Sequence, residues 1–396
     1  AGAPGPFLYA ERNEGEGRPT VLGYGHGDVI RGLAKSWNAG IEPWTLVEKD
    51  GRYYGRGTAD NKGQHTINLA ALDAVLKARG SLGFNAKWLI EMGEETGSRG
   101  LREVCETNKP LLKADVFIAS DGPRLSAERP TVFLGSRGCA AIDMWIDARE
   151  GGHHSGNWGG LLSSPAIQLV HALSTITDAK GCILVPELRP DRISNSVRAA
   201  LADCKIETAP GDPEIDPAWG EPGLSLAEKV FGWCAFEILA MTSGVPESPV
   251  NAIPPRAWAR TQVRFVVGVD PKGFVPALRR HLDKHGFPMV QVASAPGDEI
   301  MHATRLDPDH PWVKWSVASI AKTTGAPPAI LPNLGGSLPN DIFADVLGLP
   351  TVWVPHSYPG CSQHAPNEHL PKALAREALQ IMAGLYWDLG EPGTPR

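Results

Sequence analysis

The sequence lacks the features of several common classes of protein. No apolar run approaches the roughly 18 residues that a membrane-spanning helix needs. The formal net charge is −6, and the basic residues form no cluster and do not alternate with aromatic residues. Proteins whose main partner is nucleic acid usually carry an excess of positive charge, because the phosphate backbone dominates that binding. We therefore expect neither a membrane nor a nucleic acid as partner.

Cysteine is also scarce, with six residues among 396 and no CxxC pair. Six cysteines are too few for the disulfide framework of a chain this long, which predicts reduced thiols and a cytoplasmic protein. The even number leaves a secreted protein as the alternative. Residues 1–10, AGAPGPFLYA, lack the basic start and the long apolar core of a signal peptide. Because the sequence begins with Ala1 and not with methionine, a removed targeting segment stays open.

The length and the hydrophobic pattern predict two domains, because 396 residues exceed what one core usually supports. Residues 1–131 and 308–396 alternate short apolar runs with helical periodicity, which predicts an α/β domain with a mostly parallel sheet flanked by helices. Residues 132–307 contain strands of alternating polarity, which predicts an inserted α+β domain with one exposed sheet face. Predicted strands cover residues 20–26, 86–91, 114–120, 139–148, 257–267 and 289–294. Predicted helices cover residues 62–80, 164–176, 271–286 and 370–388.

Two local features add to this prediction. Ser98 is expected to cap a short helix that follows it, because serine side chains accept hydrogen bonds from the first turn of a helix. Residues 205–224 are rich in proline, glycine and acidic residues and are expected to form a long surface loop.

Ionisable residues follow nearly every predicted parallel strand. In open α/β sheets, ligand sites form beyond the carboxyl ends of the strands. The candidates at these positions are His26, Asp28, Asp60, Glu94, Glu95, Asp121 and His364. Each has an ordinary interpretation by itself, such as a helix cap, a solvated acidic turn or a loop histidine. Their shared position is what points to a common site.

The spacing of these residues favours a division of roles. His26 and Asp28 are two residues apart on extended backbone and point to one side, which suits a metal-binding imidazole held by a carboxylate. Glu94 and Glu95 are adjacent and point in opposite directions, so that one can face a metal ion and the other a water molecule. Two imidazoles and three carboxylates can hold two divalent ions that share one carboxylate. Nitrogen and oxygen ligands without thiolate suit zinc, manganese or cobalt.

Seven motifs then follow one another between residues 25 and 368: GHGD, GRGTADNKG, GEETGS, SDGPR, HHSGNWGG, GGSLP and QHAPNE. In this order they resemble the family of dinuclear zinc peptidases and amidohydrolases that contains carnosinase, carboxypeptidase G2, aminoacylase-1 and succinyl-diaminopimelate desuccinylase. The carnosinase-type dipeptidases are the nearest branch. The resemblance implies a phosphorylase/hydrolase-like catalytic domain with two zinc ions and an inserted lid domain through which the chain forms a homodimer.

The resemblance also implies the ligands of the two metal ions. His26, Asp60 and Asp121 would surround one ion. Asp60, Glu95 and His364 would surround the other, so that Asp60 bridges both.

Further roles in the catalytic domain follow from the same resemblance. Asp28 would orient His26, and Glu94 would be the general base. The peptide bond between Asp60 and Asn61 is expected to be cis.

The lid domain is expected to contribute residues that contact the substrate. By the resemblance, His154 of the partner subunit stabilises the oxyanion, with His153 as the competing candidate. Arg264 would bind a substrate carboxylate, a role that suits its planar set of donors, although a surface arginine on a strand is the ordinary alternative. Asn251 and the turn 335–339, with Gly336 and Ser337, would line the pocket.

The sequence departs from the family pattern in three places. Only 25 residues precede His26, where the family usually has several dozen, which puts the first helix in doubt. The proline that usually follows the Asp-Val pair is missing from GHGDVIRG, and Gln64 stands where a glycine is common. None of these departures removes a ligand.

Together these features predict metal-dependent hydrolysis of an amide bond in a small substrate with a free carboxylate, such as a dipeptide. N-acyl- or N-carbamoyl-amino acids are the alternative substrates. Glu94 would take a proton from the attacking water and pass it to the leaving amine. Two other interpretations remain: a ligand-binding homologue without activity, and a single-metal aminopeptidase, which would not need His154. The lid is expected to move on hinges near residues 131–138 and 300–310.

Overall fold

The computed structural model describes residues 5–206, 214–296 and 300–395. The chain divides into two compact units. The first unit is built from the stretches 1–136, 196–214 and 304–396, and the second from 137–195 and 215–303. The insertion expected at 132–307 differs from the second unit mainly at 196–214. That segment belongs to the first unit because Cys204 is buried there and Arg129 pairs with Asp203.

The first unit is organised around a seven-stranded sheet in the described residues. Neighbouring strands of the central part, β5, β2, β6 and β15, run parallel, whereas β1 is antiparallel to β5 at one edge and β15 is antiparallel to β7. The strands in spatial order are β1 (Phe7–Arg12), β5 (Asn85–Glu91), β2 (Thr20–His26), β6 (Val116–Ala119), β15 (Thr351–Trp353), β7 (Thr131–Phe133) and β14 (Ala329–Leu331).

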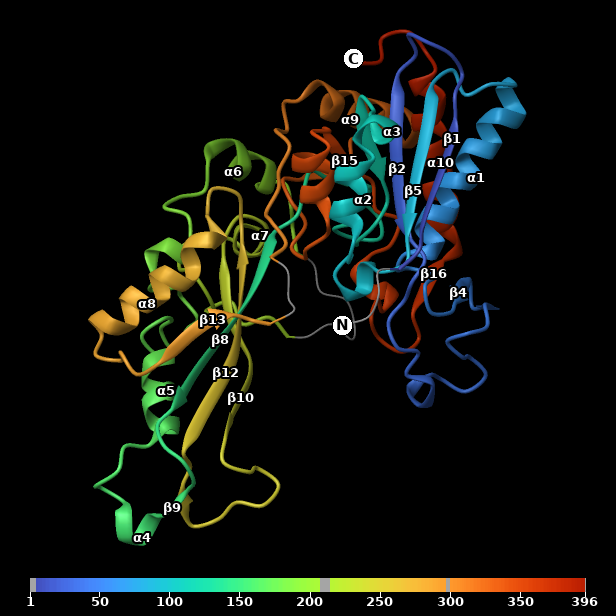
Figure 1. The fold of residues 1–396 in the computed structure, drawn as a ribbon. Coiled ribbons are helices and arrows are strands. Elements are labelled where there is room, and N and C mark those ends of the chain that lie inside the picture. Colours follow the sequence, from blue (N-terminus) through green and yellow to red (C-terminus); the bar gives the residue numbers. More distant parts are fainter. Residues whose placement is uncertain (1–4, 207–213, 297–299, 396) are drawn as a thin grey trace. The chain divides into compact units, whose positions relative to one another are not determined.

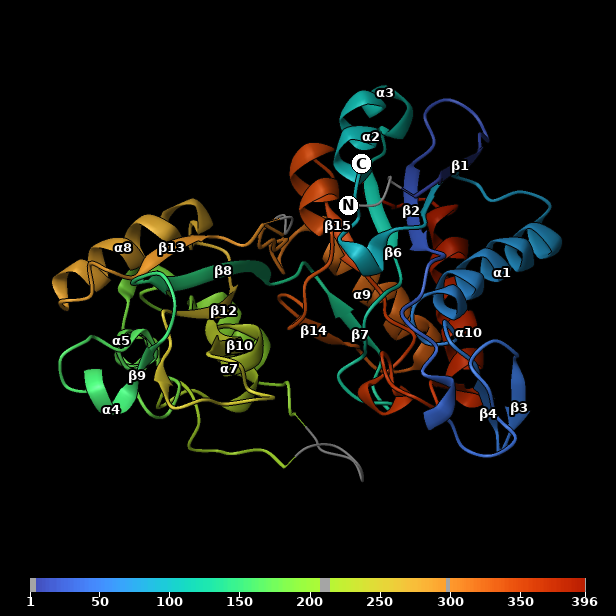
Figure 2. The same ribbon diagram turned by 60° about the horizontal axis from the view of Figure 1, so that its bottom comes forward.

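Helices cover both faces of this sheet, as Figures 1 and 2 show. One face packs against α1 (Lys62–Arg79), α9 (Pro311–Thr324) and α10 (Lys372–Leu389), whose apolar side chains share one core with the strands. The other face packs against α2 (Leu101–Thr107) and a π-helical turn, Ile342–Val346. The short helix α3 (Lys109–Leu112) follows α2. Because the central strands are buried on both faces, they read as continuous apolar runs in the sequence.

Aromatic side chains fill the second face of the sheet. The rings of Tyr24 and Phe343 lie 5.0 Å apart, and those of Phe117 and Phe343 lie 4.3 Å apart. Trp353 is fully buried and contacts Phe117 and Phe133. Aromatic residues dominate core energetics through their large buried area, so this cluster holds β2, β6 and β15 firmly at the sheet centre.

The second unit contains an antiparallel sheet in the order β10 (Ala235–Ser243), β12 (Arg256–Phe265), β8 (Gly138–Asp147) and β13 (Gln291–Ser294). Along β12 buried and partly exposed residues alternate, because one face packs against α5 (Pro165–Leu173) and α8 (Phe274–Lys284). Beyond one end of this sheet, β9 (His153–His154) pairs with β11 (Ala252–Ile253) and leads into α4 (Ser155–Trp158).

Smaller elements complete the described chain. In the first unit, β3 (Val47–Lys49), β4 (Arg52–Tyr54) and β16 (His369–Pro371) form a three-stranded sheet. The remaining helices are α6 (Asn195–Leu201) and α7 (Leu226–Phe231), the latter with a capping box between Ser225 and Glu228.

The structure confirms the predicted fold class, and the main elements lie within a few residues of their predicted bounds. The predicted cap at Ser98 is wrong, because α2 begins after Gly100 and the Ser98 hydroxyl donates to Glu91 instead. The described part of the predicted loop at 205–224 contains no helix or strand, and residues 207–213 lie outside the described residues.

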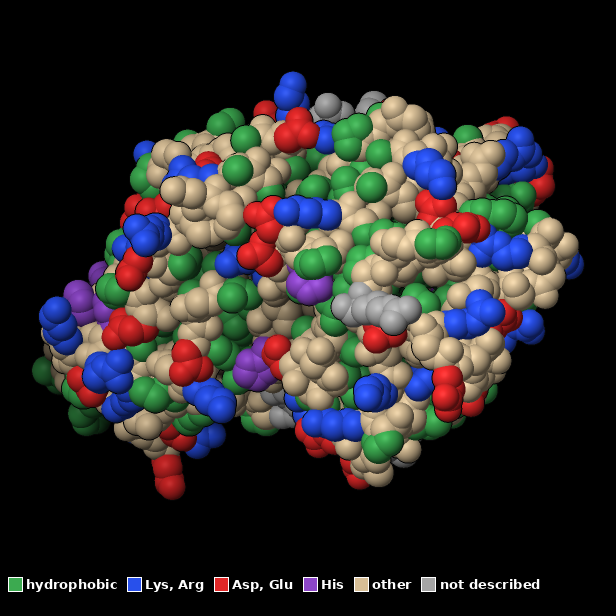
Figure 3. Space-filling view, turned by 90° about the horizontal axis from the view of Figure 1, so that it is seen from above, with side chains coloured by type: hydrophobic (Ala, Val, Ile, Leu, Met, Phe, Trp, Pro, Cys, Tyr) green, Lys and Arg blue, Asp and Glu red, His purple; other side chains and the backbone are tan. Residues whose placement is uncertain are grey.

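Three further features concern the surface charges, the helices and the cysteines. Figure 3 shows acidic and basic side chains interspersed over the face that it draws. In the described residues, no helix is long and apolar enough to cross a membrane. All six cysteines are described, and none forms a disulfide.

His356, just beyond β15, provides a test of this packing. The imidazole is fully buried, and Nδ1 has no hydrogen-bond partner among the described residues, while Nε2 lies 2.9 Å from Asn68 Oδ1. Burial lowers the pKa of His356 from its ordinary value of 6.5 to about 3. Below pH 6.5, His356 therefore binds a proton in the unfolded chain but stays neutral in the folded chain. The free energy of unfolding that depends on His356 is highest above pH 6.5 and declines as the pH falls toward 3.

We predict that the metal-free protein loses on the order of 1 kcal/mol of stability through His356 between about pH 7.5 and pH 5.5. In His356→Gln, whose amide can still donate to Asn68, this part of the pH dependence should disappear. Urea unfolding at both pH values, with a chelator present, measures the difference. Replacing the exposed His171 by glutamine is the control and should leave the slope of wild type unchanged. Equal slopes for wild type and His356→Gln would contradict the assignment.

Candidate metal centre

The ionisable residues predicted from the strand ends lie together at one edge of the parallel sheet in the first unit. His26 is the last residue of β2, and Asp121 follows β6 by two residues. Glu94 and Glu95 begin a 3₁₀ turn that is separated from the end of β5 by two residues. The other two residues lie in loops, Asp60 just before α1 and His364 beyond β15. The parallel order of β5, β2 and β6 places their carboxyl ends at the same edge.

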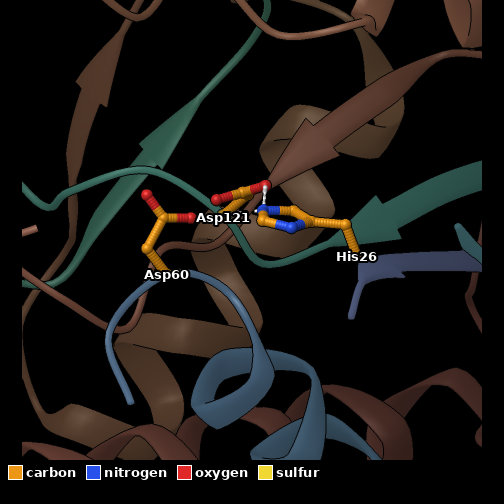
Figure 4. Close-up of side chains that lie close together, drawn as sticks. All are labelled: His26, Asp60 and Asp121. Carbon is orange, nitrogen blue, oxygen red and sulfur yellow. Dashed lines mark hydrogen bonds and ion pairs between the residues drawn. The ribbon is translucent and has the colours of Figure 1, made fainter. Parts of the chain in front are cut away.

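His26, Asp60 and Asp121 form the first cluster, drawn in Figure 4. His26 Nε2 lies 3.2 Å from Asp60 Oδ1 and 3.6 Å from Asp121 Oδ2. The side chains of His26 and Asp121 are buried, so the fold has already fixed their positions.

Asp60, Glu95 and His364 form the second cluster. His364 Nε2 lies 3.1 Å from Asp60 Oδ2 and 2.9 Å from Glu95 Oε2. In each cluster the three candidate ligand atoms lie within 4.8 Å of one another. The two oxygens of Asp60 thus face two different imidazoles, which is the geometry that a carboxylate shared between two cations needs.

Asp28 supports both clusters from behind. Its carboxylate lies 3.4 Å from His26 Nδ1, and its backbone oxygen lies 3.1 Å from the same nitrogen. The carboxylate also accepts hydrogen bonds from the backbone N–H groups of Glu94 and Glu95, at 3.2 and 3.1 Å. Asp28 therefore orients the His26 ring and at the same time holds the turn that carries the two glutamates.

The two adjacent glutamates have different surroundings. Glu95 faces His364 and belongs to the second cluster. Glu94 belongs to neither cluster, and its Oε2 lies 3.9 Å from His26 Nε2. Glu94 is therefore close to the candidate ligands without being one of them, as a base acting beside a metal ion must be.

The donor atoms of the clusters fit divalent cations. Asp121 Oδ2 is buried and accepts no hydrogen bond from any described residue. A buried carboxylate oxygen without a donor is costly unless a cation neutralises it. All candidate ligand atoms are imidazole nitrogens or carboxylate oxygens, which zinc, manganese and cobalt accept.

Comparison with known proteins gives the family. The profile of peptidase family M20/M25/M40 matches residues 22–388. The chain belongs to this family. M20 metallopeptidases use divalent metal ions, in agreement with the donor set of the two clusters.

Relatives of this M20 peptidase include proteins named as dipeptidases. The chain is 24% identical to the beta-Ala-His dipeptidase of Rattus norvegicus, over 98% of this chain and 80% of the relative. It is 27% identical to the Cys-Gly metallodipeptidase of Candida albicans, over 92% of this chain and 77% of the relative.

Solved structures share the fold along nearly the whole chain. The M20 family metallo-carboxypeptidase Sso-CP2 from Sulfolobus solfataricus has a TM-score of 0.82 and 25% identity, over 97% of this chain and 88% of that one. Human carnosine dipeptidase 1 has a TM-score of 0.75 and 22% identity, over 97% of this chain and 83% of that one.

Burial and ion pairing shift the pKa values of the ionisable groups in the M20 peptidase. Burial raises the pKa of Asp121 to about 7, and burial together with the charge of Asp121 raises the pKa of Glu94 well above its ordinary value. Hydrogen bonds to Asp60 and Glu95 raise the pKa of His364 to about 10. Burial lowers the pKa of His26, but hydrogen bonds to Asp28 and Asp60 outweigh it and raise that pKa to about 12. Asp121 and Glu94 are thus buried carboxyl groups that favour a proton or a nearby cation.

The turn that carries Asp60 is tied to the strand ends through its neighbour. The peptide bond Asp60–Asn61 is cis, as predicted. The Asn61 side chain donates to Ser120 O at 2.8 Å and accepts from the His26 backbone N–H at 3.3 Å. Asn61 therefore links the ends of β2 and β6 to the turn that carries Asp60.

Three predicted site residues lie in the second unit of the M20 peptidase. His154 ends β9 opposite Ala252, and its Nδ1 accepts from the backbone N–H of Gly156 at 3.1 Å. Asn251 lies at the same place, because its backbone oxygen accepts from Ser155 N at 2.9 Å. Arg264 lies near the other end of the sheet, where Nε donates to Gln262 Oε1 at 3.0 Å.

Gly336 and Ser337 lie in the first unit, in the turn that follows β14. This turn is tied to the chain after β7, since Leu334 N donates to Gly135 O at 2.8 Å. His153 pairs with Ile253 and its ring packs against Trp158, whereas His154 is exposed, so the structure distinguishes the two histidines by environment.

Sequence analysis missed a buried ion pair beneath the second cluster. Arg56 Nη1 donates to Glu368 Oε2 at 2.7 Å, and both side chains are almost completely buried. Both residues stand inside quoted motifs, GRGTADNKG and QHAPNE, where charged residues without an assigned role were the only available signal. Gln64 was noted as a departure from the family, and it donates to Ala59 O and accepts from His356 N.

The dual contacts of Asp28 lead to a prediction about the glutamate turn. In Asp28→Asn the acceptor loses its charge, and bonds to charged groups contribute about 1.5–3 kcal/mol. We predict that amide hydrogens of residues 92–98 exchange on the order of tenfold faster in the metal-free variant, measured by mass spectrometry. Asp115→Asn is the matched control, because Asp115 accepts from Thr20 N at 2.7 Å in the same unit. Unchanged exchange in Asp28→Asn, or an equal increase in the control, would refute the role.

Proposed function

We propose that this M20 peptidase hydrolyses the amide bond of a dipeptide with a free carboxylate, in a reaction that depends on divalent metal ions. The observation that carries the proposal is the environment of Asp60, whose two carboxylate oxygens each lie close to a different imidazole. The two relatives described above, each aligned over more than nine-tenths of the chain, are named as dipeptidases, which favours a dipeptide over an N-acyl- or N-carbamoyl-amino acid.

We infer that each chain binds two divalent ions. Zinc is the first candidate, and manganese or cobalt are the alternatives. His26, Asp60 and Asp121 would hold one ion, and Asp60, Glu95 and His364 the other. Such ions, when bound, polarise a carbonyl group and make water more acidic. A chain with a shared aspartate and one imidazole on either side is suited to two ions close together.

The protein's own groups would move the protons. Glu94 lies beside the ligands but outside both clusters, so it is free to take a proton from the attacking water and to pass it to the leaving amine. Asp28 keeps the His26 ring and the Glu94 turn in place while this happens.

The substrate contacts proposed for the second unit require two subunits. Arg264 pairs with Cys139, whereas Arg256, at the other end of β12, pairs with Asp147 on the side toward His154. Eight residues of strand separate Arg256 from Arg264, which is roughly 27 Å at 3.4 Å per residue. A dipeptide is much shorter, so His154 and Arg264 of one chain cannot contact the same molecule. We infer that Arg264 binds the substrate carboxylate in one subunit and that His154 of the partner subunit stabilises the oxyanion.

The second unit offers a surface for this homodimer. Strand β10 lies at an edge of its sheet, and the side chains of Ile238, Leu239 and Met241 are exposed. Ile167 and Val170 of α5 are exposed as well. An apolar edge strand without protection is a template for pairing with another chain, so a second copy of β10 is the partner that we propose.

Substrate class and base are tested together. We predict chelator-sensitive amino-acid release from dipeptides in a panel that also contains N-acetyl- and N-carbamoyl-amino acids, with zinc or manganese added. Glu94→Gln should lose roughly 10²–10⁴-fold in kcat, because a general base contributes about this much, yet should bind metal like wild type. Release from acylated amino acids alone would move the assignment to an amidohydrolase. Metal binding without any release would indicate a ligand-binding protein, and full turnover by Glu94→Gln would remove the base.

Complementation tests the role of the partner subunit. Glu94→Ala and His154→Ala should each be inactive alone. When the two variants are co-expressed, half of the dimers are mixed and each of these has one site with both residues, so we expect about a quarter of wild-type activity. Activity that stays at the level of the single variants would mean that His154 acts within its own chain or not at all.

A further inference from the structure

We propose that Glu368 and Arg56 form a positioning clamp that holds Asp60 and His364 at the spacing of the second cluster. The clamp, defined as this buried ion pair, rests on the proposed function in so far as the second cluster binds a metal ion. Neither residue is among the candidate ligands, so the inference concerns how the ligands are held and not which residues they are.

Glu368 gathers the backbone of the turn that leads to Asp60. Its Oε1 accepts hydrogen bonds from three N–H groups: Gly57 at 3.0 Å, Ala59 at 2.9 Å and Asp60 at 3.0 Å. Its backbone oxygen accepts a fourth, from Gly55 N at 3.1 Å. Four backbone N–H groups of the turn, including that of Asp60, therefore donate hydrogen bonds to one glutamate. This glutamate lies more than 300 positions away in the sequence.

Arg56 makes the connection in the opposite direction. Its Nη1 donates to Glu368 Oε2 at 2.7 Å and its Nη2 donates to Ala365 O at 3.0 Å, next to His364. The guanidinium carbon lies 5.7 Å from the centre of the Trp37 ring, which covers it. The two segments are thus joined in both directions. Arg56 of the turn 55–60 donates hydrogen bonds to residues 365 and 368, and Glu368 accepts hydrogen bonds from the backbone of the turn.

The cost of burying this pair suggests that it serves the site. Glu368 is fully buried and the Arg56 side chain is almost so, and taking charges out of water is expensive even when they are paired. An apolar pair could fill the same space, but it could not accept three backbone N–H groups. The charged pair instead fixes the geometry between two segments that carry candidate ligands. Hydrogen bonds from residues around the ligands tune metal affinity in this way.

The two clusters should depend on the clamp to different degrees. Asp60 and His364 both belong to the second cluster and both stand on clamped segments. In the first cluster, His26 and Asp121 are placed by β2 and β6, and Asp60 alone is clamped. A general loss of stability would not discriminate between the clusters, whereas loss of the clamp weakens the second more than the first.

The test compares zinc affinities in defined backgrounds, by competition with a chromophoric chelator. Asp121→Asn leaves the second cluster complete, and His364→Gln leaves the first complete. Glu368→Gln, which can still accept backbone N–H groups but loses the charged partner of Arg56, should weaken zinc binding 10–100-fold in the Asp121→Asn background and clearly less in the His364→Gln background. With Glu368→Gln alone, dipeptide turnover should fall at limiting zinc and recover at excess zinc.

Glu377→Gln is the control, because it makes the same change opposite another buried arginine of the first unit, Arg124, at a glutamate side chain that is 36% exposed. Thermal unfolding of both variants shows whether their losses of stability are comparable, and only Glu368→Gln should change zinc affinity. Equal effects in the two backgrounds, or equal effects of Glu368→Gln and the control, would overturn the clamp. Absence of zinc binding by wild type itself would instead reject the proposed function, so the two failures are distinguishable.

Discussion

The burial of several carboxylates at one place is the constraint that the first unit has to satisfy. Asp60, Glu94, Glu95 and Asp121 meet at one edge of the sheet, where burial raises the pKa of Asp121 and Glu94. Two imidazoles between them supply partial compensation, and cations would complete it. Such a group persists only when the scaffold over-determines every position, because each carboxylate by itself would turn toward water.

Two layers of support meet this requirement. Asp28 holds the His26 ring and the backbone of the glutamate turn, and Asn61 joins the turn of Asp60 to the strand ends. Behind them, Glu368 and Arg56 connect segments that are remote in sequence but adjacent at the second cluster. In the proposed assignment, glutamate would perform three different tasks within a short distance, with Glu95 as ligand, Glu94 as base and Glu368 as structural acceptor. Surroundings, and not identity, separate these tasks.

In the proposed function, the second unit would contact a small substrate with residues that lie far apart on one sheet. Its candidate contacts, Arg264 and His154, lie toward opposite ends of β12, so one copy cannot use both on one dipeptide. Exposed apolar residues on β10 and α5 offer the surface by which a second copy could supply the missing contact. In the proposed function, the length of β12 keeps the two contacts of one chain too far apart for one dipeptide, so that catalysis would depend on dimer formation.

The sequence by itself determined the elements and most of the candidate site. Residues 20–26 form a strand because an apolar run bounded by turns is buried on both faces, and α1 ends where Gly80 supplies a left-handed residue. Ligand candidates were predictable because parallel strands end at one edge. Only the tertiary structure decided that Ser98 bonds to Glu91 instead of capping α2, that 196–214 joins the first unit, and that Glu368 holds the turn of Asp60. These contacts depend on which segments, remote in the sequence, pack against one another. The local sequence pattern does not specify that packing.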